Sequence, residues 1–232
     1  NNTITTVSKI YKNSELFTTK DLEQNVNTTN ATKYTVSDGE RINITSEGVY
    51  LISGTAKNVT IYVEAGDTDK VQIVLENLSV TNETMPVIYV KTADKVFVTS
   101  NGENNLKVTR TFVKEDSNNL NAVIFSKQDI TFNGTGTLNI ESTANGITGK
   151  DDVKITGGTY GETNTMGRLI TNQGTAIIEN VTSNFRTGVY NTGTITLTNV
   201  VMEGLVGDLE AANAAVSHAK LYNTGTITIT GD

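Results

Sequence analysis

Apolar and polar residues alternate along most of this chain, so that apolar side chains recur two positions apart. Ile195 and Leu197 have this spacing, and so do Ile227 and Ile229. Successive side chains of a strand point to opposite faces of a sheet, whereas a helix repeats its apolar positions every three or four residues. The period therefore predicts an all-β chain and disfavours repeats that contain α-helices.

The alternation belongs to a unit that recurs along the chain. Three segments are near copies of one another: Asn172-Gln-Gly-Thr-Ala-Ile-Ile-Glu-Asn-Val, Asn191-Thr-Gly-Thr-Ile-Thr-Leu-Thr-Asn-Val and Asn223-Thr-Gly-Thr-Ile-Thr-Ile-Thr-Gly-Asp. The same frame fits segments that begin at Val90, Ser126 and Gly149. Self-similarity at an interval of roughly twenty residues or more is the sequence signature of a stacked repeat architecture.

When the six copies are aligned, equivalent residues form columns. Two columns are apolar throughout and are predicted to face the interior: Ile88, Ile124, Ile147, Ile170, Val189 and Leu221 in one, and Val96, Ile130, Val153, Ala176, Ile195 and Ile227 in the other. A third column lies where the chain turns and contains Val90, Ser126, Gly149, Asn172, Asn191 and Asn223. Stacked Asn amides can hydrogen-bond along such a column. A β-sandwich also alternates but predicts no column of this kind, so we predict a parallel β-helix, a solenoid of stacked coils.

The repeat sets the expected domain boundaries. Residues 1–13 alternate loosely and are predicted to form a strand-like arm, residues 14–40 an N-terminal cap, and residues 41–232 the β-helix itself. Two segments break the alternation. Residues 14–25 are expected to form a turn or two of helix, and residues 202–218 a short helical excursion.

Composition and charge narrow the classes of function. The net charge of -7 disfavours binding to nucleic acid. It also disfavours naked polyanions unless a local basic strip or a bridging cation reverses the sign, which brings calcium into consideration. No run of residues is apolar and long enough to predict a membrane span. The chain begins at Asn1 without a Met or a signal peptide, so we expect a processed, secreted protein at a bacterial surface. The absence of cysteine leaves the redox compartment open.

A series of motifs, in order along residues 15–158, resembles a clostridial family of surface carbohydrate-binding proteins. The motifs are Phe17-Thr-Thr-Lys-Asp-Leu, Tyr34-Thr-Val-Ser-Asp-Gly, Gly48-Val-Tyr-Leu-Ile-Ser-Gly-Thr, Asp69-Lys-Val-Gln-Ile-Val-Leu-Glu-Asn, Pro86-Val-Ile-Tyr-Val-Lys-Thr-Ala-Asp-Lys-Val, Asn121-Ala-Val-Ile-Phe-Ser-Lys-Gln-Asp-Ile-Thr and Gly146-Ile-Thr-Gly-Lys-Asp-Asp-Val-Lys-Ile-Thr-Gly-Gly. The resemblance implies a right-handed parallel β-helix like that of pectate lyases, bound calcium, no catalysis, and binding of cellulose or acidic, pectin-like polysaccharide. After residue 158, Asn-Thr-Gly-Thr coils replace the Asp-rich coils associated with this family.

Charged residues recur beside the turn column. Lys91, Lys127 and Lys150 occupy one outward column of the alignment, which is predicted to meet successive uronate carboxylates of a polysaccharide. The expected Ca²⁺ ligands are Asp129, Glu141, Asp151 and Asp152, because calcium is bound by several oxygens, commonly carboxylates. The alternative hypothesis is that these lysines and acids only neutralise one another on a solvated face.

Aromatic residues share a second outward column. Tyr89, Phe125, Tyr190 and Tyr222 occupy it, and their rings are candidates to stack on sugar faces. The alternative is that the rings stabilise the sheet by packing across strands without any ligand. Tryptophan, the ring that a flat cellulose-binding platform usually presents, is absent from the chain. The two interpretations stay open at the level of sequence.

The sequence offers little for catalysis. A lyase needs an Arg or Lys base beside a metal-held substrate, and none of the four arginines lies in a coil copy next to an acidic cluster. The single histidine, His218, lies in the 202–218 excursion. The least implausible enzymatic arrangement uses Lys150 as the base and Asp151 and Asp152 as metal ligands. We therefore predict a binding protein rather than an enzyme.

An alternative function follows from the ends of the solenoid. The repeat continues to Thr230, and an exposed last coil presents unpaired backbone groups that a further strand can extend. The arm at residues 1–13 is a candidate donor strand for a neighbouring copy, and head-to-tail repetition of this contact builds a fibre. The main hypothesis is thus a calcium-associated polysaccharide-binding β-helix, and the alternative is a structural fibre subunit; the two are compatible.

Overall fold

A computed structural model describes two long segments of the chain and a series of shorter strands. The described residues are 17–115, 117–164, 170–172, 175–179, 182–185, 189–191, 194–198, 201–203, 221–223 and 226–230, with side chains described up to residue 161. Within these residues every regular element is a strand, as the alternation predicted, and no helix is present. The described part of the chain accordingly contains no helix suited to crossing a membrane.

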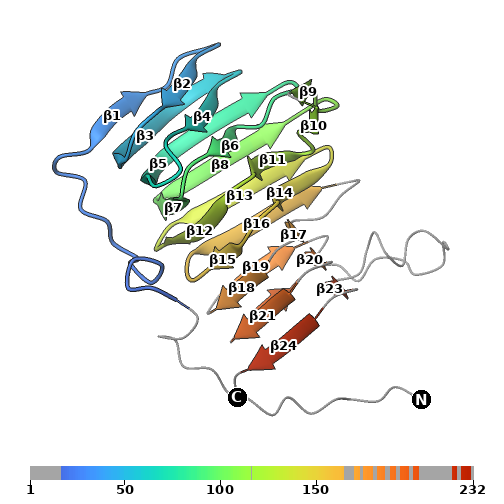
Figure 1. Cartoon of the computed structure of the whole chain (residues 1–232). Helices are drawn as coiled ribbons and strands as arrows, with labels where there is room; N and C mark the ends of the chain where they lie inside the picture. The colour runs from blue at the N-terminus through green and yellow to red at the C-terminus, as the bar shows by residue number, and fades with distance from the viewer. Residues whose placement is uncertain are drawn as a thin grey trace, which may run out of the picture.

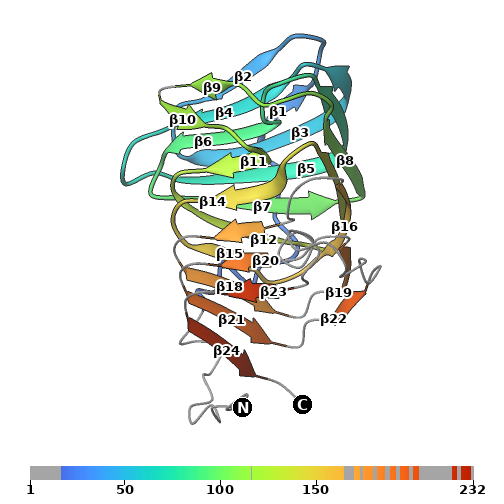
Figure 2. The same cartoon turned by 90° about the vertical axis from the view of Figure 1, so that its right-hand side faces the viewer.

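The strands form three columns of parallel neighbours in curled sheets (Figures 1 and 2). The first column is an eight-stranded sheet: β2 (Arg41–Ile44), β4 (Thr60–Glu64), β6 (Ile88–Thr92), β11 (Ala122–Ser126), β14 (Asn145–Gly149), β17 (Ile170–Asn172), β20 (Val189–Asn191) and β23 (Leu221–Asn223). The second column contains β7 (Lys95–Asn101), β12 (Asp129–Gly134), β15 (Val153–Ile155), β18 (Thr175–Glu179), β21 (Thr194–Thr198) and β24 (Thr226–Thr230). The third column contains β8 (Glu103–Val108), β13 (Thr137–Ser142), β16 (Thr159–Asn164), β19 (Thr182–Phe185) and β22 (Val201–Glu203).

Long strands near the start of the chain join the second and third columns into one sheet. The first half of β5 (Lys70–Asn82) pairs with β7 and its second half pairs with β8. On its other side β5 pairs with β3 (Gly48–Lys57), and β3 pairs with β1 (Thr32–Thr35). From β6 onward the chain visits the first, second and third columns in turn and then returns to the first. A small antiparallel pair, β9 (Lys114–Glu115) and β10 (Asn118–Asn119), lies in one of these returns.

The strand registers confirm the columns that were read from the sequence. Ile88 pairs with Ile124, and the same register continues through Ile147, Ile170 and Val189 to Leu221. The column from Val96 to Ile227 and the turn column from Val90 to Asn223 are likewise in register across their strands. In the repeated coils, the alternation of inward and outward side chains and the position of the turn were therefore enough to predict which residues are neighbours.

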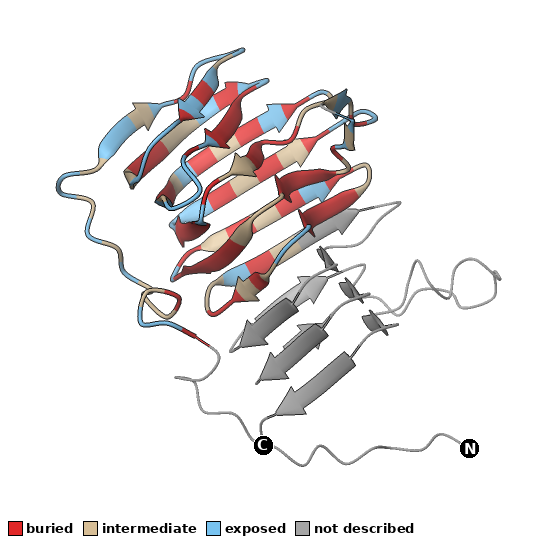
Figure 3. Cartoon of the chain, viewed as in Figure 1, coloured by how far each residue is buried: buried red, intermediate tan, exposed pale blue. Residues whose placement is uncertain are grey.

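The two apolar columns point into a common interior. Ile88, Ile124 and Ile147 of the first column face Val96 and Ile130 of the second, and all five are fully buried. Alternating buried and exposed bands run along the strands in Figure 3, as expected for sheets with one face on a core. Burial of these aliphatic side chains, at roughly 1.5 to 3 kcal/mol each, is the main force that holds successive coils together.

The segment before β1 forms a strap, defined here as residues 17–24, rather than the helical turn that was predicted within residues 14–25. The strap is a hydrogen-bonded turn in which the Thr18 amide donates to Asp21 Oδ2 (2.8 Å) and the Asp21 amide donates to Thr18 Oγ1 (3.1 Å). This pattern resembles the capping box of a helix, but no helix follows, and the Asp21 carboxylate also contacts the sheet. In Figure 1 the strap lies beside the strands of the second column.

The strap covers the outer face of the second column through polar contacts. Lys95 Nζ and Thr131 Oγ1 donate to Asp21 Oδ1, at 2.6 Å and 2.8 Å, and Thr156 Oγ1 donates to the Asp21 carbonyl at 2.6 Å. The Gly134 amide donates to Gln24 Oε1 at 2.8 Å. Residues of β7 and β12, and Thr156 directly after β15, therefore share one partner segment, and the strap ties three successive coils together.

The structure describes only part of the segments to which the remaining boundary predictions refer. The predicted helical excursion at 202–218 begins within a strand, because Met202 and Glu203 belong to β22; its other residues lie outside the described residues. The arm at 1–13 also lies outside the described residues. Within the predicted cap at 14–40, the described residues form the strap and β1. The three-part domain division stays a prediction.

Candidate functional site

The predicted lysine column lies at the corner between the first and second columns. The backbone amide of Lys127 donates to the Val90 carbonyl (3.0 Å), and that of Lys150 donates to the Ser126 carbonyl (2.9 Å). Lys91, Lys127 and Lys150 therefore follow one another in successive coils. The ammonium group of Lys91 lies 3.2 Å from Glu64 Oε1, and that of Lys150 lies 5.9 Å from the centre of the Phe125 ring. The structure thus aligns the three lysines, although Lys91 already has an acidic neighbour.

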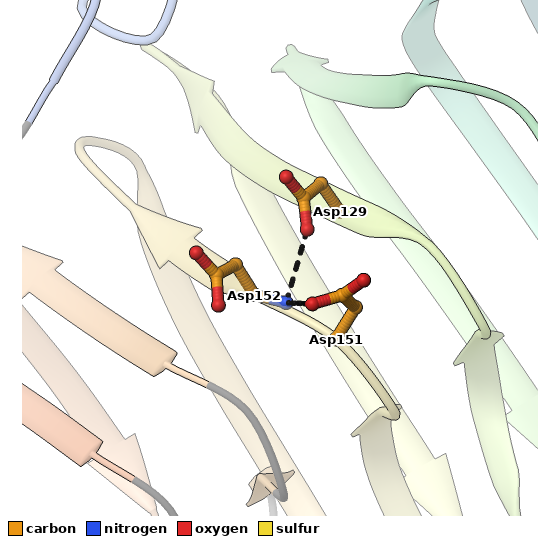
Figure 4. A group of neighbouring side chains, drawn as sticks. All are labelled: Asp129, Asp151 and Asp152. Carbon is orange, nitrogen blue, oxygen red and sulfur yellow. Dashed lines mark hydrogen bonds between the residues drawn. The ribbon is translucent and has the colours of Figure 1, made fainter. Parts of the chain in front are cut away.

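Three of the four predicted metal ligands meet beside this corner. Asp129 begins β12, and Asp151 and Asp152 lie in the turn before β15, where one carboxylate oxygen of each residue lies within 4.8 Å of the others. The Asp152 amide donates to Asp129 Oδ1 (3.2 Å) and to Asp151 Oδ1 (3.1 Å), as Figure 4 shows. We call these three residues the aspartate cluster. Its side chains come from adjacent coils because the parallel register places β12 and β15 next to each other.

The electrostatics of the aspartate cluster suit a cation. Burial raises the pKa of Asp129, and the negative charges of Asp151 and Asp152 raise it further. Like charges this close destabilise one another unless a proton or a cation intervenes. Calcium takes about six to eight oxygen ligands, so three carboxylates provide part of a coordination sphere that water or a ligand's oxygens would complete.

Glu141, the fourth predicted metal ligand, lies elsewhere. It belongs to β13 in the third column, where its Oε1 is 2.8 Å from Lys107 Nζ. Among the residues whose side chains are described, the group that can hold a metal consists of the three aspartates without Glu141. The sequence placed Glu141 one coil from Asp151 but could not tell which face of the coil it occupies.

The aromatic column is in register but covered. Tyr89 lies between Tyr62 and Phe125, with ring centres 5.3 Å and 5.8 Å apart in edge-to-face geometry. The side chains of Tyr89 and Phe125 are fully buried, although they point away from the main core. Leu120 and Val113, from the loop that contains β9 and β10, pack over them. In this conformation the two rings stabilise the loop and do not contact solvent.

Tyr190 and Tyr222 continue the same register in β20 and β23. Their side chains lie outside the described residues, so their role as stacking platforms stays a prediction. Arg41 lies beside the aromatic column, and its guanidinium carbon is 3.8 Å from the centre of the Tyr62 ring. Arg41 also pairs with Glu115 of β9 at 3.6 Å, which anchors the covering loop from its other side.

An open polar groove lies on the third column, and sequence reasoning missed it. The groove has a volume of about 360 Å³ and crosses β5, β8, β13 and β16. Asn105, Asn139 and Gly161 are aligned in its floor by the strand register. The sequence did contain a pattern that could have revealed the groove, because these residues occupy one outward position of the third strand in successive coils. The sequence alignment covered only the first two strands of each coil, whose spacing is the more regular.

Comparison with known sequences finds a family that matches most of the chain. The sequence profile of the family described as carbohydrate-binding domain-containing protein matches residues 38–230. A relative of that description from Acetivibrio thermocellus is 37% identical over 138 residues, which cover 57% of this chain and 48% of the relative. The chain thus spans about half the length of this curated relative.

A solved structure is similar in fold at lower sequence identity. It is described as the polysaccharide lyase-like protein from C. thermocellum, in a gadolinium derivative, and superposes with a TM-score of 0.61 at 22% identity. The match covers 87% of this chain and 99% of that one. At this identity the similarity concerns the fold, whereas the sequence profile spans most of the chain. The chain belongs to the family of carbohydrate-binding domain-containing proteins.

Proposed function

We propose that this protein is an extracellular, non-catalytic polysaccharide-binding protein of a bacterial surface, and that it holds calcium when it binds acidic polysaccharide. The observation that carries the proposal is the aspartate cluster next to the lysine column. Both sit at one corner of the fold and draw residues from successive coils. A repeating ligand with regularly spaced carboxylates fits a surface on which charges repeat.

Binding at this corner uses two kinds of charge. Neighbouring parallel strands lie about 4.8 Å apart, a spacing comparable with the length of one sugar unit. Lys127 and Lys150 would each meet one carboxylate of a polyuronate chain. A Ca²⁺ held by Asp129, Asp151 and Asp152 would supply positive charge where the protein is otherwise negative, and would bridge the protein to further carboxylates. The net charge of -7 opposes the approach of an acidic ligand, and such a bridge would offset part of that repulsion.

The fold that we propose for the whole chain is a right-handed parallel β-helix. Three columns of parallel strands visited in a fixed order support it, because such an order generates stacked coils. A right-handed path is expected, because crossover connections between parallel strands of one sheet are right-handed in about 98% of cases. The similarity to a polysaccharide lyase-like structure agrees with this fold and leaves the enzymatic alternative to be tested.

The non-catalytic assignment is supported by the family description, which refers to binding. Lys150, the candidate base named from the sequence, is exposed, and its ammonium group lies 5.9 Å from the centre of the Phe125 ring. The test is incubation with polygalacturonate and Ca²⁺, followed by ultraviolet absorbance of unsaturated products. Sustained product release that is lost in Lys150→Ala would establish a pectate-lyase-type enzyme instead.

The binding proposal is tested by affinity electrophoresis or calorimetry with polygalacturonate, with and without a chelator. We expect binding that needs Ca²⁺ and that the double variant Asp151→Asn, Asp152→Asn weakens at least tenfold. The variant Glu141→Gln is the matched control, because it removes one carboxylate from the third column and leaves the aspartate cluster intact. Equal losses in the two variants, or binding indifferent to the chelator, would refute this site.

A second candidate function is a structural subunit of a head-to-tail surface fibre. The observation that favours it is that β22, β23 and β24 each end a column, with a neighbouring strand on one side only among the described residues. Such edges accept a further strand. The donor that we propose is the arm at residues 1–13 of the next copy. Negative-stain microscopy of the full chain and of a chain lacking residues 1–13 tests this: identical assembly of the two would exclude strand donation.

A further inference from the structure

The strap, residues 17–24, is held on the body by contacts between residues that are far apart in the sequence. Its hydrogen bonds with Lys95 and Thr156 join residues separated by 74 and 135 positions. Inside the strap, Thr18 and Asp21 bond to each other, so the strap has a local turn of its own. Local bonds thus shape the strap, and long-range bonds hold it on the second column.

The outer face of the second column has a site that is shaped for the strap. The buried carboxylate of Asp21 lies 2.6 Å from Lys95 Nζ and 3.5 Å from Lys154 Nζ. A Cβ atom at Gly157 would overlap the amide oxygen of Gln24, so the glycine leaves the space that this amide fills. Without a strap, two largely buried lysines would lack their carboxylate, which is costly. The face therefore requires a strap, and the same contacts are available to the strap of a second copy.

The segment that joins the strap to β1 has the properties of a hinge. None of residues 25–31 is buried. The hydrogen bonds inside this segment are local: the Thr29 amide donates to Asn27 Oδ1 (3.0 Å), and the Ala31 amide donates to the Thr28 carbonyl (3.1 Å). The second bond closes a turn directly before β1, and in Figure 1 the segment runs outside the sheets. Opening this turn redirects the strap while β1 keeps its place beside β3.

The hinge lies at the end of the body where the two large sheets begin. Among the described residues, β1 has β3 as its neighbour on one side only, and β2 has β4 on one side only. The sheet order from this end is β1, β3, β5, β7, β12 and β15, so the strap of one chain folds back from β1 towards β15. With the turn open, the strap would extend beyond β1 instead. There it would reach the second column of a copy whose N-terminal end faces this one.

We propose that two copies of this chain form a dimer by exchanging straps, with their N-terminal ends together. Each strap fills the site on the second column of the other copy, and the turn at residues 28–31 is the hinge. The exchanged dimer contains the same strap contacts as the closed monomer, which makes exchange a low-cost route to a dimer. Strap exchange is independent of the ligand, and it differs from the fibre contact, which uses residues 1–13 and the last coil. A dimer would present two charged corners and so would gain avidity for a repeating polymer.

Isotope mixing distinguishes strap exchange from other kinds of dimer. Isotope-labelled and unlabelled full chains are unfolded, mixed in equal amounts and refolded at high concentration, and the dimer is isolated by size-exclusion chromatography with light scattering. An amine-reactive crosslinker then joins Lys20 of the strap to Lys154 of the second column, which contacts the neighbouring Asp21. Mass spectrometry determines whether the two halves of each crosslink carry the same isotope. The crosslink between Lys127 and Lys150, in successive coils of one body, is the internal control.

We expect about half of the crosslinks between Lys20 and Lys154 in the dimer to carry both isotopes, because random pairing of equal amounts makes half of the exchanged dimers mixed. Crosslinks between Lys127 and Lys150 should carry a single isotope. A dimer in which the crosslinks between Lys20 and Lys154 also carry a single isotope would overturn strap exchange.

The hinge is tested by deleting Thr29 and Asn30, the central residues of the turn. The shortened segment cannot fold back as before, so the dimer fraction should rise severalfold. Glu23→Ala is the control, because it breaks an exposed pair with Lys20 and keeps the contacts of Asp21; its dimer fraction should equal that of the wild type. A chain that stays monomeric with and without the deletion would overturn strap exchange and leave the proposed function standing.

Discussion

The outer faces of the second and third columns are built from similar residues, but one is covered by the chain itself and the other is open. The second column presents Thr131 and Asn133 in β12, and the third presents Asn105 and Asn139 in β8 and β13. On the second column the strap covers these side chains, and Asn133 Nδ2 donates to the Asp21 carbonyl at 3.2 Å. On the third column they remain half-buried in an open groove. The same outward polar residues thus serve as a docking site for the chain itself in one place and as a candidate ligand site in the other.

The contrast shows that a row of outward polar side chains on neighbouring strands is not by itself evidence of ligand binding. The two faces differ in that the second column is covered by a segment that carries a charged group, Asp21. Burial alone raises the pKa of Asp21, but hydrogen bonds from Lys95, Thr18 and Thr131 outweigh it and lower the pKa from 3.8 to about 2. The strap supplies a buried carboxylate that pairs with Lys95 and Lys154 of this face. On the third column, Lys107 pairs instead with Glu141 of the neighbouring strand.

The largest effect is expected from removing the strap's anchor. Asp21→Ala leaves Lys95 and Lys154, both largely buried, without the carboxylate that they share, and we expect a loss of about 3 to 5 kcal/mol in the free energy of unfolding. Thermal or denaturant unfolding measures it. Glu23→Ala in the same strap breaks only an exposed pair with Lys20, and should cost less than about 0.5 kcal/mol. Similar losses for the two variants would mean that the strap is held by something other than Asp21.

Truncating the covered aromatic column should also destabilise the fold without affecting binding. Phe125 is fully buried between Tyr89 and the loop that contains β9 and β10, so Phe125→Ala is expected to cost about 3 kcal/mol. Polygalacturonate affinity, measured below the unfolding temperature, should stay within twofold of wild type. If affinity falls sharply while stability is retained, the loop opens on binding and the original stacking hypothesis for Phe125 is correct.

Stability should decline in acid through the same carboxylate. Because the pKa of Asp21 is lower in the folded state than its ordinary 3.8, its contribution is complete above that pH and is lost as the pH falls towards 2. The shift corresponds to about 2 kcal/mol. Denaturant unfolding between these pH values measures the loss, and Asp21→Asn should flatten the profile in this window. An unchanged acid limb in Asp21→Asn would assign the pH dependence to other carboxyl groups.

The smallest effect on stability is expected on the open face. Asn139→Ala removes one half-exposed hydrogen bond to Asn105, so the free energy of unfolding should change by less than about 1 kcal/mol. Asn133→Ala, the equivalent change under the strap, should cost more, because Asn133 is buried and also contacts Thr99. If the two alanine variants are equally mild, the comparison between covered and open faces fails.

The sequence was sufficient for the parts of the protein that repeat. Residues two apart alternate between core and surface, and the copies from Val90 to Asn223 gave the neighbours in successive coils correctly, including the burial of Ile124 and Val96. It also brought together Asp129, Asp151 and Asp152, because their alignment to the repeat determines which turn they occupy. A fixed period of two and a parallel register convert position in the sequence directly into position in space.

What only the tertiary structure decided is which outward residues are covered. Tyr89 and Phe125 were assigned correctly to an outward column, yet a loop packs over them; Glu141 was assigned to the metal site, yet its strand belongs to another face. The strap's contact between Asp21 and Lys95 joins residues far apart in the chain and follows no repeat. Coverage depends on irregular segments whose paths are set by a few long-range polar and apolar contacts, and local periodicity carries no information about those contacts.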